Sequence, residues 1–252
     1  MQLQIPSKKI PIQEIKLDKN IQLFIKREDL IHPGISGNKY WKLFHNINQY
    51  FETLPEMPLI ITFGGAYSNH IAAVSEVGKL FGIRTLGIIR GEELEAKWRE
   101  NPTLVFAKNN DMNLRFVTRE EYRNKEKLAD FLAEEFKDSL IIPEGGTNKT
   151  AVQGIKMMLN NDTKDFDYLC TAVGTGGTVA GLSSFCEENQ KVIGFNVVED
   201  SSLQDKISEL TFRQNFSLIS AAFGGYGKII DENVRFINNF KKEFNIQLDP
   251  IY

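Results

Sequence analysis

The sequence predicts an α/β fold in which helices cover parallel sheets on both faces. Short apolar runs, most of them rich in β-branched residues, alternate with segments of helical periodicity along the chain. Because each pairing of parallel strands needs a crossover connection, helices between successive strands favour parallel sheets. Glycine turns follow three of the apolar runs, where strands pass into helices. With 252 residues and 42% hydrophobic content, the chain can bury a substantial core.

Eight strands and eight helices are expected from the apolar runs and the segments between them, and no internal repeat stands out. The strands begin with LFIK and LIITF and occupy residues 23–26, 59–63, 85–89, 114–118, 140–142, 168–173, 192–198 and 216–220. The helices occupy residues 38–50, 69–81, 102–110, 119–136, 148–160, 178–189, 203–210 and 230–244.

Composition points to a small-molecule enzyme or a binding module. The net charge of −3 gives no electrostatic reason to expect a nucleic-acid or acidic-membrane partner. The N-terminus lacks the apolar core of a signal peptide, and no run approaches the length of a membrane span, so we expect a cytoplasmic protein. Cys170 and Cys186 lie in apolar surroundings without a nearby histidine, which predicts buried, reduced thiols and neither a metal site nor a disulfide framework.

The glycine turns are candidates for the walls of one cleft, because ligands gather at the carboxyl ends of strands in open α/β sheets. They are Gly64-Gly65, Gly145-Gly146 and the segment GTGGTVAGL at 174–182. In the last of these, backbone N–H groups and a helix N-terminus can face an anion, which makes it a candidate phosphate cradle. It lacks the lysine of a Walker A loop and the G-x-G-x-x-G spacing. A tight turn that needs glycine for packing is the equally available alternative.

The segment FGGAYSNHIAAV, residues 63–74, places several polar side chains at one strand end. Ser68 or Asn69 can cap the following helix, and a ligand carboxylate would satisfy the same orphan N–H groups. Tyr67, Ser68, Asn69 and His70 are more hydrogen-bonding groups than a cap requires. His70 taken alone would more often be structural than a base.

Two lysines follow the turn in ISGNKYWKL, residues 35–43. If Ser36 is the N-cap, Lys39 falls in the first helical turn, where the dipole disfavours an ammonium and favours the neutral amine that a Schiff base requires. Lys42 lies one turn further on and is better interpreted as a solvated or anion-facing charge. Most lysines are surface residues, so Lys39 taken alone would also be interpreted as a solvated surface residue.

The combination of an imine-forming lysine, an asparagine-bearing turn and a glycine phosphate cradle suits pyridoxal 5′-phosphate. The motifs KREDL, SGNK, GGAYSNH, PEGGTN and GTGGT closely resemble those of the 1-aminocyclopropane-1-carboxylate deaminase and D-cysteine desulfhydrase family. That family belongs to the fold-type II, tryptophan synthase β-like, pyridoxal-phosphate enzymes. The resemblance covers nearly the whole chain and implies two parallel-rich open sheets covered by helices. SGNK followed by SNH is specific to this group, whereas GTGGT is more widespread.

The resemblance also implies roles for individual residues. Lys39 would form the Schiff base with pyridoxal phosphate and act as base at the substrate α-carbon, and Asn69 would hydrogen-bond the phenolic oxygen of the cofactor. Ser68, Asn69 and His70 would receive the substrate carboxylate, and Ser68 would assist ring opening in a deaminase. Tyr226 and Tyr252 match tyrosines that line the family's active site. The phosphate would be held by Gly174, Thr175, Gly176, Gly177 and Thr178.

The family architecture further implies a large cofactor domain from residues 1–42 and 158–252 and a small domain, 43–157, that closes over the substrate. The chain stops at Tyr252 where relatives continue, so we expect the C-terminal part of the large domain to be incomplete. In the family, the residue after this tyrosine is usually acidic in the deaminases and threonine in the desulfhydrases, and it faces the pyridine nitrogen of the cofactor. The sequence does not include that position. Trp41 and the pair Ala66-Tyr67 depart from residues common among relatives and could alter the pocket beside Ser68.

The leading hypothesis is a pyridoxal-phosphate-dependent lyase that acts on a small amino acid, with β-elimination of D-cysteine to pyruvate, ammonia and sulfide as the expected activity. Deamination of 1-aminocyclopropane-1-carboxylate is the alternative, and the Ala66-Tyr67 pair argues against it more than Ser68 argues for it. A hypothesis of another class is a module that binds pyridoxal phosphate or another phosphate ligand without efficient turnover. The resemblance suggests a homodimer, and no metal, nucleic-acid or membrane partner is expected.

Overall fold

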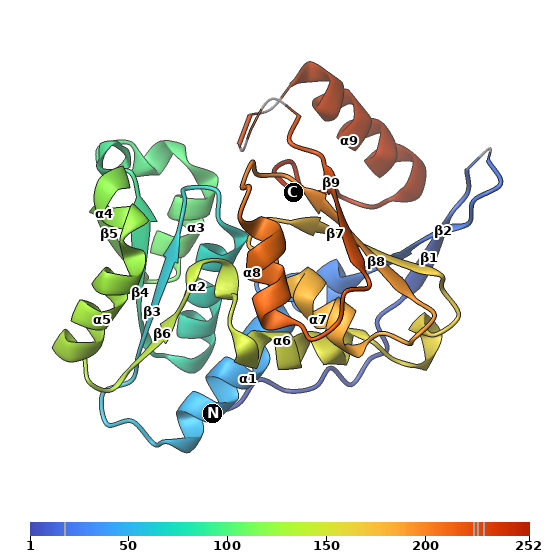
Figure 1. The fold of residues 1–252 in the computed structure, drawn as a ribbon. Helices are drawn as coiled ribbons and strands as arrows, with labels where there is room; N and C mark the ends of the chain where they lie inside the picture. The colour runs from blue at the N-terminus through green and yellow to red at the C-terminus, as the bar shows by residue number, and fades with distance from the viewer. Residues whose placement is uncertain (18, 224, 226, 229) are drawn as a thin grey trace.

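The fold consists of two parallel sheets and one antiparallel hairpin, with helices packed around the two sheets (Figure 1). The structure is a computed structural model and describes residues 1–17, 19–223, 225, 227–228 and 230–252. Nearly all the expected strands and helices are found, and the α/β class with two parallel sheets is confirmed. Among the described residues, none of the helices has both the length and the hydrophobicity that crossing a bilayer requires.

The first sheet has four parallel strands in the order β5-β4-β3-β6. Every residue of its central strand β3 is buried, as expected for a strand covered on both faces. The chain runs from β3 outward through β4 to β5 and then returns to pair β6 with the other side of β3. The order therefore reverses at β3, and ligands bind at such reversals outside the carboxyl ends of the strands. The bounds are β3 Leu59–Gly64, β4 Arg84–Arg90, β5 Asn113–Val117 and β6 Ser139–Ile142.

Helices cover both faces of this sheet (Figure 1). One face packs against α2, Asn69–Phe81, and α3, Pro102–Asn109, where residues such as Ile60, Ile71 and Leu104 are fully buried. The opposite face is covered by α4, Arg119–Arg123, and α5, Lys125–Glu135, which form a smaller core around Phe63 and Leu132.

The second sheet has three parallel strands in the order β7-β8-β9. Its main apolar core is continuous with that of the first sheet, through α1 and α6, which pack against each other between the two sheets. The bounds are β7 Tyr168–Val173, β8 Lys191–Asn196, β9 Phe216–Ser220, α1 Asn38–Glu52, α6 Lys149–Ile155, α7 Gly177–Phe185, α8 Leu203–Leu210 and α9 Asp231–Phe244.

The remaining described elements are short. The hairpin pairs β1, Ile12–Ile15, with β2, Leu23–Lys26, in antiparallel register. The 3-10 turns are η1 Glu28–Leu30, η2 Glu92–Leu94, η3 Trp98–Glu100, η4 Glu144–Gly146, η5 Lys156–Met158 and η6 Asn161–Thr163.

Several expectations need correction. The strand β1 was not predicted, and the helix expected over 119–136 is two helices that meet at Asn124, whose backbone leaves the helical region. The helix expected over 148–160 ends at Ile155 and continues as the 3-10 turn η5, and that expected over 178–189 ends at Phe185. Cys186 is a buried free thiol as expected, but Cys170 is exposed. The domain bounds at residues 42/43 and 157/158 fall inside α1 and η5 and stay a prediction.

Candidate active site

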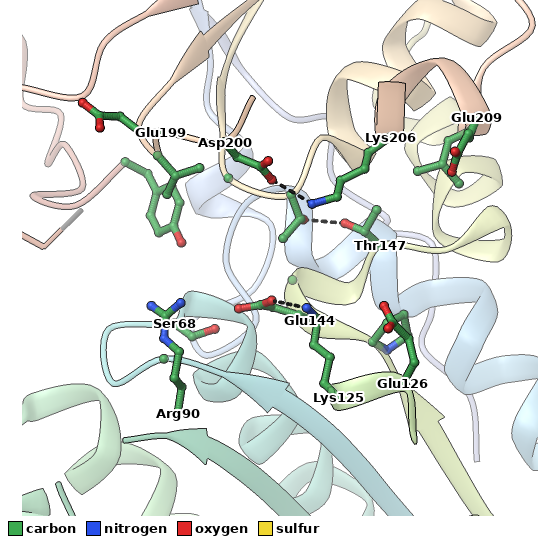
Figure 2. A pocket seen from close by; sticks show the side chains of 18 residues that line it. Ser68, Arg90, Lys125, Glu126, Glu144, Thr147, Glu199, Asp200, Lys206 and Glu209 are labelled. Atoms are coloured by element: carbon green, nitrogen blue, oxygen red, sulfur yellow. Dashed lines mark hydrogen bonds and ion pairs between the residues drawn. The ribbon is translucent and has the colours of Figure 1, made fainter. Parts of the chain in front are cut away.

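A cavity of about 700 Å³ opens where the strand ends of the two parallel sheets approach each other (Figure 2). Its walls come from the turns that follow four strands, β3, β6, β7 and β8. Gly65 and Ser68 follow β3, Gly145 and Thr147 follow β6, Gly174 and Thr175 follow β7, and Val198 and Asp200 follow β8. The three glycine turns singled out in the sequence thus line one cavity.

Lys39 lies in the first turn of α1, as the sequence predicted. The N-cap, however, is Gly37 with φ of 62° and not Ser36, and the position makes no side-chain capping bond. The Lys39 Nζ atom donates a hydrogen bond to Asn38 Oδ1 at 3.1 Å. Burial lowers the pKa of Lys39 to about 8, and Asp249 acts in the opposite direction by attracting the ammonium. A substantial fraction of neutral, nucleophilic amine is therefore available near neutral pH.

Lys42 is not a solvated surface residue, since its exposed fraction is only 2%. Its Nζ atom donates to the carbonyl oxygen of Gly145 and to Thr147 Oγ1, both at 2.8 Å. Burial, and secondarily the charge of Lys39, holds the pKa of Lys42 well below its ordinary value. The prediction that Lys42 is solvated is therefore wrong, and the prediction that it faces an anion stays a prediction.

The turn after β7 has the geometry expected of a cradle. Gly176, the N-cap of α7, has φ of 82°, which favours glycine. A Cβ atom added to Gly177 would lie 3.0 Å from Lys42 Nζ, so this lysine closely approaches the first turn of α7. Asn38 Nδ2 donates to Thr178 Oγ1 at 2.6 Å, and the hydroxyls of Thr147 and Thr175 are 2.5 Å apart. The N-termini of α1 and α7 therefore meet at the same place.

The side chains of the SNH segment, residues 68–70, lie in three different environments. Ser68 is the N-cap of α2, where its Oγ accepts a hydrogen bond from the Ile71 N–H at 3.3 Å, and it also lines the cavity. Asn69 is exposed, and its Nδ2 donates to Asp249 Oδ2 at 2.6 Å. Tyr67 is 40% exposed, whereas His70 is fully buried. The side-chain crowding expected at this strand end is therefore only partial.

His70 is an unusual buried group, because neither ring nitrogen has a hydrogen-bond partner among the described residues. A Cβ atom at Gly146, whose φ is 66°, would lie 2.8 Å from the His70 Cε1 atom, so the ring packs directly on this turn. Burial, followed by the charges of Lys39 and Lys42, lowers the pKa of His70 well below its ordinary value. The lowered pKa favours the neutral imidazole, and among the described residues both of its nitrogens keep their hydrogen-bonding capacity unfilled.

Tyr252 is a predicted site residue at the C-terminal end of the sequence, and it also lies at the cavity. It lines the wall, and its ring lies close enough to Gly174 that a Cβ there would be 3.0 Å from Cε1. The backbone N–H groups of Ile251 and Tyr252 donate to Asp249 Oδ1 at 2.7 and 2.9 Å, which fixes the end of the chain. Tyr226 lies outside the described residues.

These residues fit pyridoxal phosphate. The site gathers the half-buried Lys39, the buried Lys42 and a glycine turn that opens a helix, and these features favour an anion such as a phosphate. One lysine, Lys39, has a lowered pKa suited to condensation with an aldehyde. The unpartnered nitrogens of His70 are a further sign of an incomplete polar environment.

Sequence reasoning missed the charged rim of the cavity. Arg90, Lys125 and Glu144 line it from the first sheet, and Asp200 and Lys206 line it from the second (Figure 2). Arg90 directly follows the predicted strand TLGII, so the rule that ligands gather at strand ends could have identified it. Nothing in the local sequence marks the others, since their proximity results from the packing of distant segments.

Comparison with known proteins gives a consistent result, although no family model matches the chain. A Pyrococcus horikoshii protein provisionally named 1-aminocyclopropane-1-carboxylate deaminase is 28% identical over 269 residues, which cover 96% of this chain and 80% of that protein. An Arabidopsis thaliana protein, named bifunctional D-cysteine desulfhydrase/1-aminocyclopropane-1-carboxylate deaminase, mitochondrial, is 28% identical over 94% of this chain and 66% of its own length.

Solved structures agree with the sequence comparison. A crystal structure described as an ACC deaminase homologue has a TM-score of 0.82 and 26% identity, and the match covers 100% of this chain and 83% of that one. The O-acetylserine-dependent cystathionine β-synthase of Helicobacter pylori has a TM-score of 0.68 at 15% identity over 97% of this chain and 84% of that one, which supports the fold alone. The chain is therefore a homologue of proteins named 1-aminocyclopropane-1-carboxylate deaminase and D-cysteine desulfhydrase, and it has the fold-type II architecture of pyridoxal-phosphate-dependent enzymes.

Proposed function

We propose that this enzyme catalyses β-elimination of D-cysteine to pyruvate, ammonia and sulfide. The observation that carries the proposal is the environment of Lys39, a lysine in a first helical turn with its pKa lowered to about 8. Such an amine can both condense with an aldehyde and remove a proton from a carbon atom near neutral pH. The family relationship supplies the class of reaction.

The residues of the cavity have complementary roles in this proposal. Bound pyridoxal phosphate supplies the electron sink that makes the substrate α-proton acidic. Lys39 Nζ takes that proton, and the Asn38 side chain orients the amine through its hydrogen bond. Ser68 and the N–H groups that begin α2 bind the substrate carboxylate, as the positive end of a helix dipole favours. The turn from Gly174 to Thr178, together with Lys42, binds the phosphate.

Two further roles rest on the family resemblance. Asn69 would hydrogen-bond the phenolic oxygen of the cofactor, and its Nδ2 has two N–H donors, one of which Asp249 accepts from. Movement of the segment 43–157 over the cavity would exclude water from the reacting substrate. The homodimer and the cytoplasmic location expected from the sequence stay predictions.

Ring opening of 1-aminocyclopropane-1-carboxylate is the second candidate function. It is favoured by the Ser68 hydroxyl, which lines the cavity, and by the name of the bifunctional plant relative. The test is release of 2-oxo acid by cofactor-loaded protein given D-cysteine, L-cysteine and the cyclopropane substrate in parallel. Pyruvate from D-cysteine alone supports the desulfhydrase, whereas 2-oxobutyrate from the cyclopropane overturns it in favour of the deaminase.

The assignment of the reactive lysine has its own test. Borohydride reduction of the loaded protein followed by peptide mass mapping should find the cofactor mass on Lys39, and cofactor mass on Lys42 would contradict the proposal. Lys39→Ala should abolish both the cofactor absorption band and the activity. If Lys39→Ala instead retained the affinity for pyridoxal phosphate and the wild-type protein turned over none of the three substrates, the binding-module hypothesis would replace the enzyme.

A further inference from the structure

A second cavity of about 250 Å³ adjoins the first, and its walls are strongly cationic. Arg90, Lys125 and Glu144 line both cavities, so the two spaces share a wall. Arg119 and Arg123 complete the charged lining of the second cavity. Four cationic side chains thus face one carboxylate, which is a composition suited to an anion.

Arg90 is one of two cations in this set, with Lys125, that also line the reaction cavity. It ends β4, is partly buried, and its side chain points into the cavity from the wall that also carries Ser68 (Figure 2). The described part of the chain offers its guanidinium no ion pair or hydrogen-bond acceptor. The guanidinium carbon of Arg90 lies over the face of the Tyr122 ring, 5.7 Å from the ring centroid. A partly buried guanidinium without an acceptor is an incomplete interaction that a ligand anion would satisfy.

The neighbouring cations are partly neutralised, which leaves the excess charge at Arg90. Lys125 Nζ lies 3.6 Å from the Glu144 carboxylate and also 5.7 Å from the centroid of the Tyr122 ring. Arg119 pairs with Glu93. Tyr122 is buried and contacts both Arg90 and Lys125, so it holds two cations on the same side of the cavity. Surface solvation explains the exposed Arg123, but it does not explain an arginine directed into the reaction cavity.

The main cavity, of about 700 Å³, has room for pyridoxal phosphate together with an amino acid. We propose that, in addition to D-cysteine, the enzyme binds α-amino acids whose side chain carries a second anionic group, such as a carboxylate, sulfonate or phosphate, and that Arg90 binds this group. The substrate carboxylate then lies at the N-terminus of α2, and the side chain extends toward the cationic second cavity. This inference rests on the proposed lyase function and specifies its substrate class.

The test uses the cofactor-loaded enzyme and does not depend on turnover. Racemic glutamate and racemic glutamine differ in the charge of the side-chain terminus, and their binding is followed through the change in the cofactor absorption band. In the wild-type protein glutamate should bind about tenfold more tightly than glutamine, the effect expected of a charge-assisted hydrogen bond. In Arg90→Gln this preference should vanish while glutamine binds as before, and Arg90→Lys should restore part of it.

Arg115→Gln is the matched control, because Arg115 is an exposed arginine on the neighbouring strand β5 and lines neither cavity. It should retain the full preference for glutamate. Equal affinities in the wild-type protein, or a preference that survives in Arg90→Gln, would overturn the inference. If Arg90→Gln weakened the binding of glutamate and of glutamine equally, Arg90 would bind the α-carboxylate, and the inference would again be overturned.

Competition with sodium sulfate tests whether Arg90 binds the side-chain anion of the substrate or an anion that is independent of the substrate. Sulfate that competes with glutamate but not with glutamine supports the proposed subsite, whereas Arg90-dependent sulfate binding that leaves glutamate affinity unchanged contradicts it. Failure of any amino acid to perturb the cofactor band would overturn the proposed function itself. Elimination of cysteine without discrimination between glutamate and glutamine would instead overturn the substrate class and leave the proposed function intact.

Discussion

At the scale of single residues, two lysines one helical turn apart have different chemical environments. Both lie in the active-site region, and burial lowers the pKa of each. Lys42 donates hydrogen bonds to two protein acceptors, at Gly145 and Thr147, whereas within the described residues Lys39 Nζ donates one, to the side-chain oxygen of its neighbour Asn38. An amine already engaged by two acceptors is held in place, and one with a single long hydrogen bond can reach a ligand. The difference in partners therefore distinguishes Lys42, which is held in place beside the first turn of α7, from the more reactive Lys39.

The pH dependence of Lys39 follows from its lowered pKa. Only the neutral amine reacts with an aldehyde, and raising the pH through about 8 deprotonates Lys39 in the folded protein. The rate of reductive methylation by formaldehyde, measured by peptide mapping of the cofactor-free protein, should therefore be half-maximal near pH 8. Free Nα-acetyl-lysine in the same reaction is the control and should respond near its ordinary value of roughly 10.4. A midpoint for Lys39 that coincides with the control would contradict the assignment.

Lys42→Met tests whether Lys42 faces the cofactor phosphate. Methionine has a similar length but no charge, and Lys42 Nζ lies next to the first turn of α7. Loss of a charge-assisted hydrogen bond, worth about 1.5 to 3 kcal/mol, should weaken binding of pyridoxal phosphate at least tenfold. The affinity for pyridoxal, which lacks the phosphate, should change little. An equal loss for both ligands in equilibrium titrations would mean that Lys42 supports the site without contacting the phosphate, and thermal unfolding would check that the variant is folded.

At the scale of elements, hydrophobic periodicity predicted the regular structure well because most strands and helices carry one clear apolar pattern. Helix 69–81 and strands 23–26, 168–173 and 216–220 have the predicted bounds. Strand β1 was missed because its sequence, IQEI, is too short and polar to stand out, and it becomes a strand by pairing with β2. The break at Asn124 was missed because the helical pattern continues across it.

The candidate site was predicted less completely than the fold. Glycine turns after strands and a lysine in a first helical turn are local signals, so Lys39, Ser68 and the turn at 174–178 became candidates from the residues, and the family resemblance supplied their predicted roles. The burial of His70 and Lys42 depends on the turn after β6, which is distant in sequence. Likewise, the hydrogen bond from Asn69 to Asp249 joins residues that are 180 positions apart in the sequence. Contacts of this kind follow from tertiary packing and have no local pattern.

The βα turn at Gly176 gives a prediction at the same scale. Gly176 and Gly82 both have positive φ, of 82° and 66°, but a Cβ at Gly176 would collide with Ile207 whereas nothing lies within 4 Å of one at Gly82. Gly82→Ala should therefore lower the free energy of unfolding by about 1 kcal/mol, the cost of the backbone conformation. Gly176→Ala should cost about 2 to 4 kcal/mol, because overpacking is added. Urea denaturation measures both values, and equal costs would show that α8 moves aside freely.

At the scale of the whole molecule, the active-site cavity is assembled from both sheets. Its walls combine the turns of the first sheet with those of the second, and Lys39 lies in the first turn of α1, which packs against α6 between the sheets. The principal apolar core is also shared, since buried residues of β3, α1, α6, α7 and α8 form one continuous cluster. A cavity between two halves of one core permits small adjustments of the halves, while a shared core opposes their separate unfolding.

Cooperativity of unfolding tests this shared core. Ile60 in β3 and Ile207 in α8 are both fully buried in the same cluster but belong to opposite halves. Ile60→Ala and Ile207→Ala should each lower the free energy of unfolding by about 2 to 5 kcal/mol and shift one common calorimetric transition. Saturating pyridoxal phosphate should raise that same transition, by about 2.7 kcal/mol at a hundredfold excess over its Kd. If the predicted domains at 43–157 and the rest of the chain unfold independently, each substitution would move only one of two transitions, and the continuous core would not couple them.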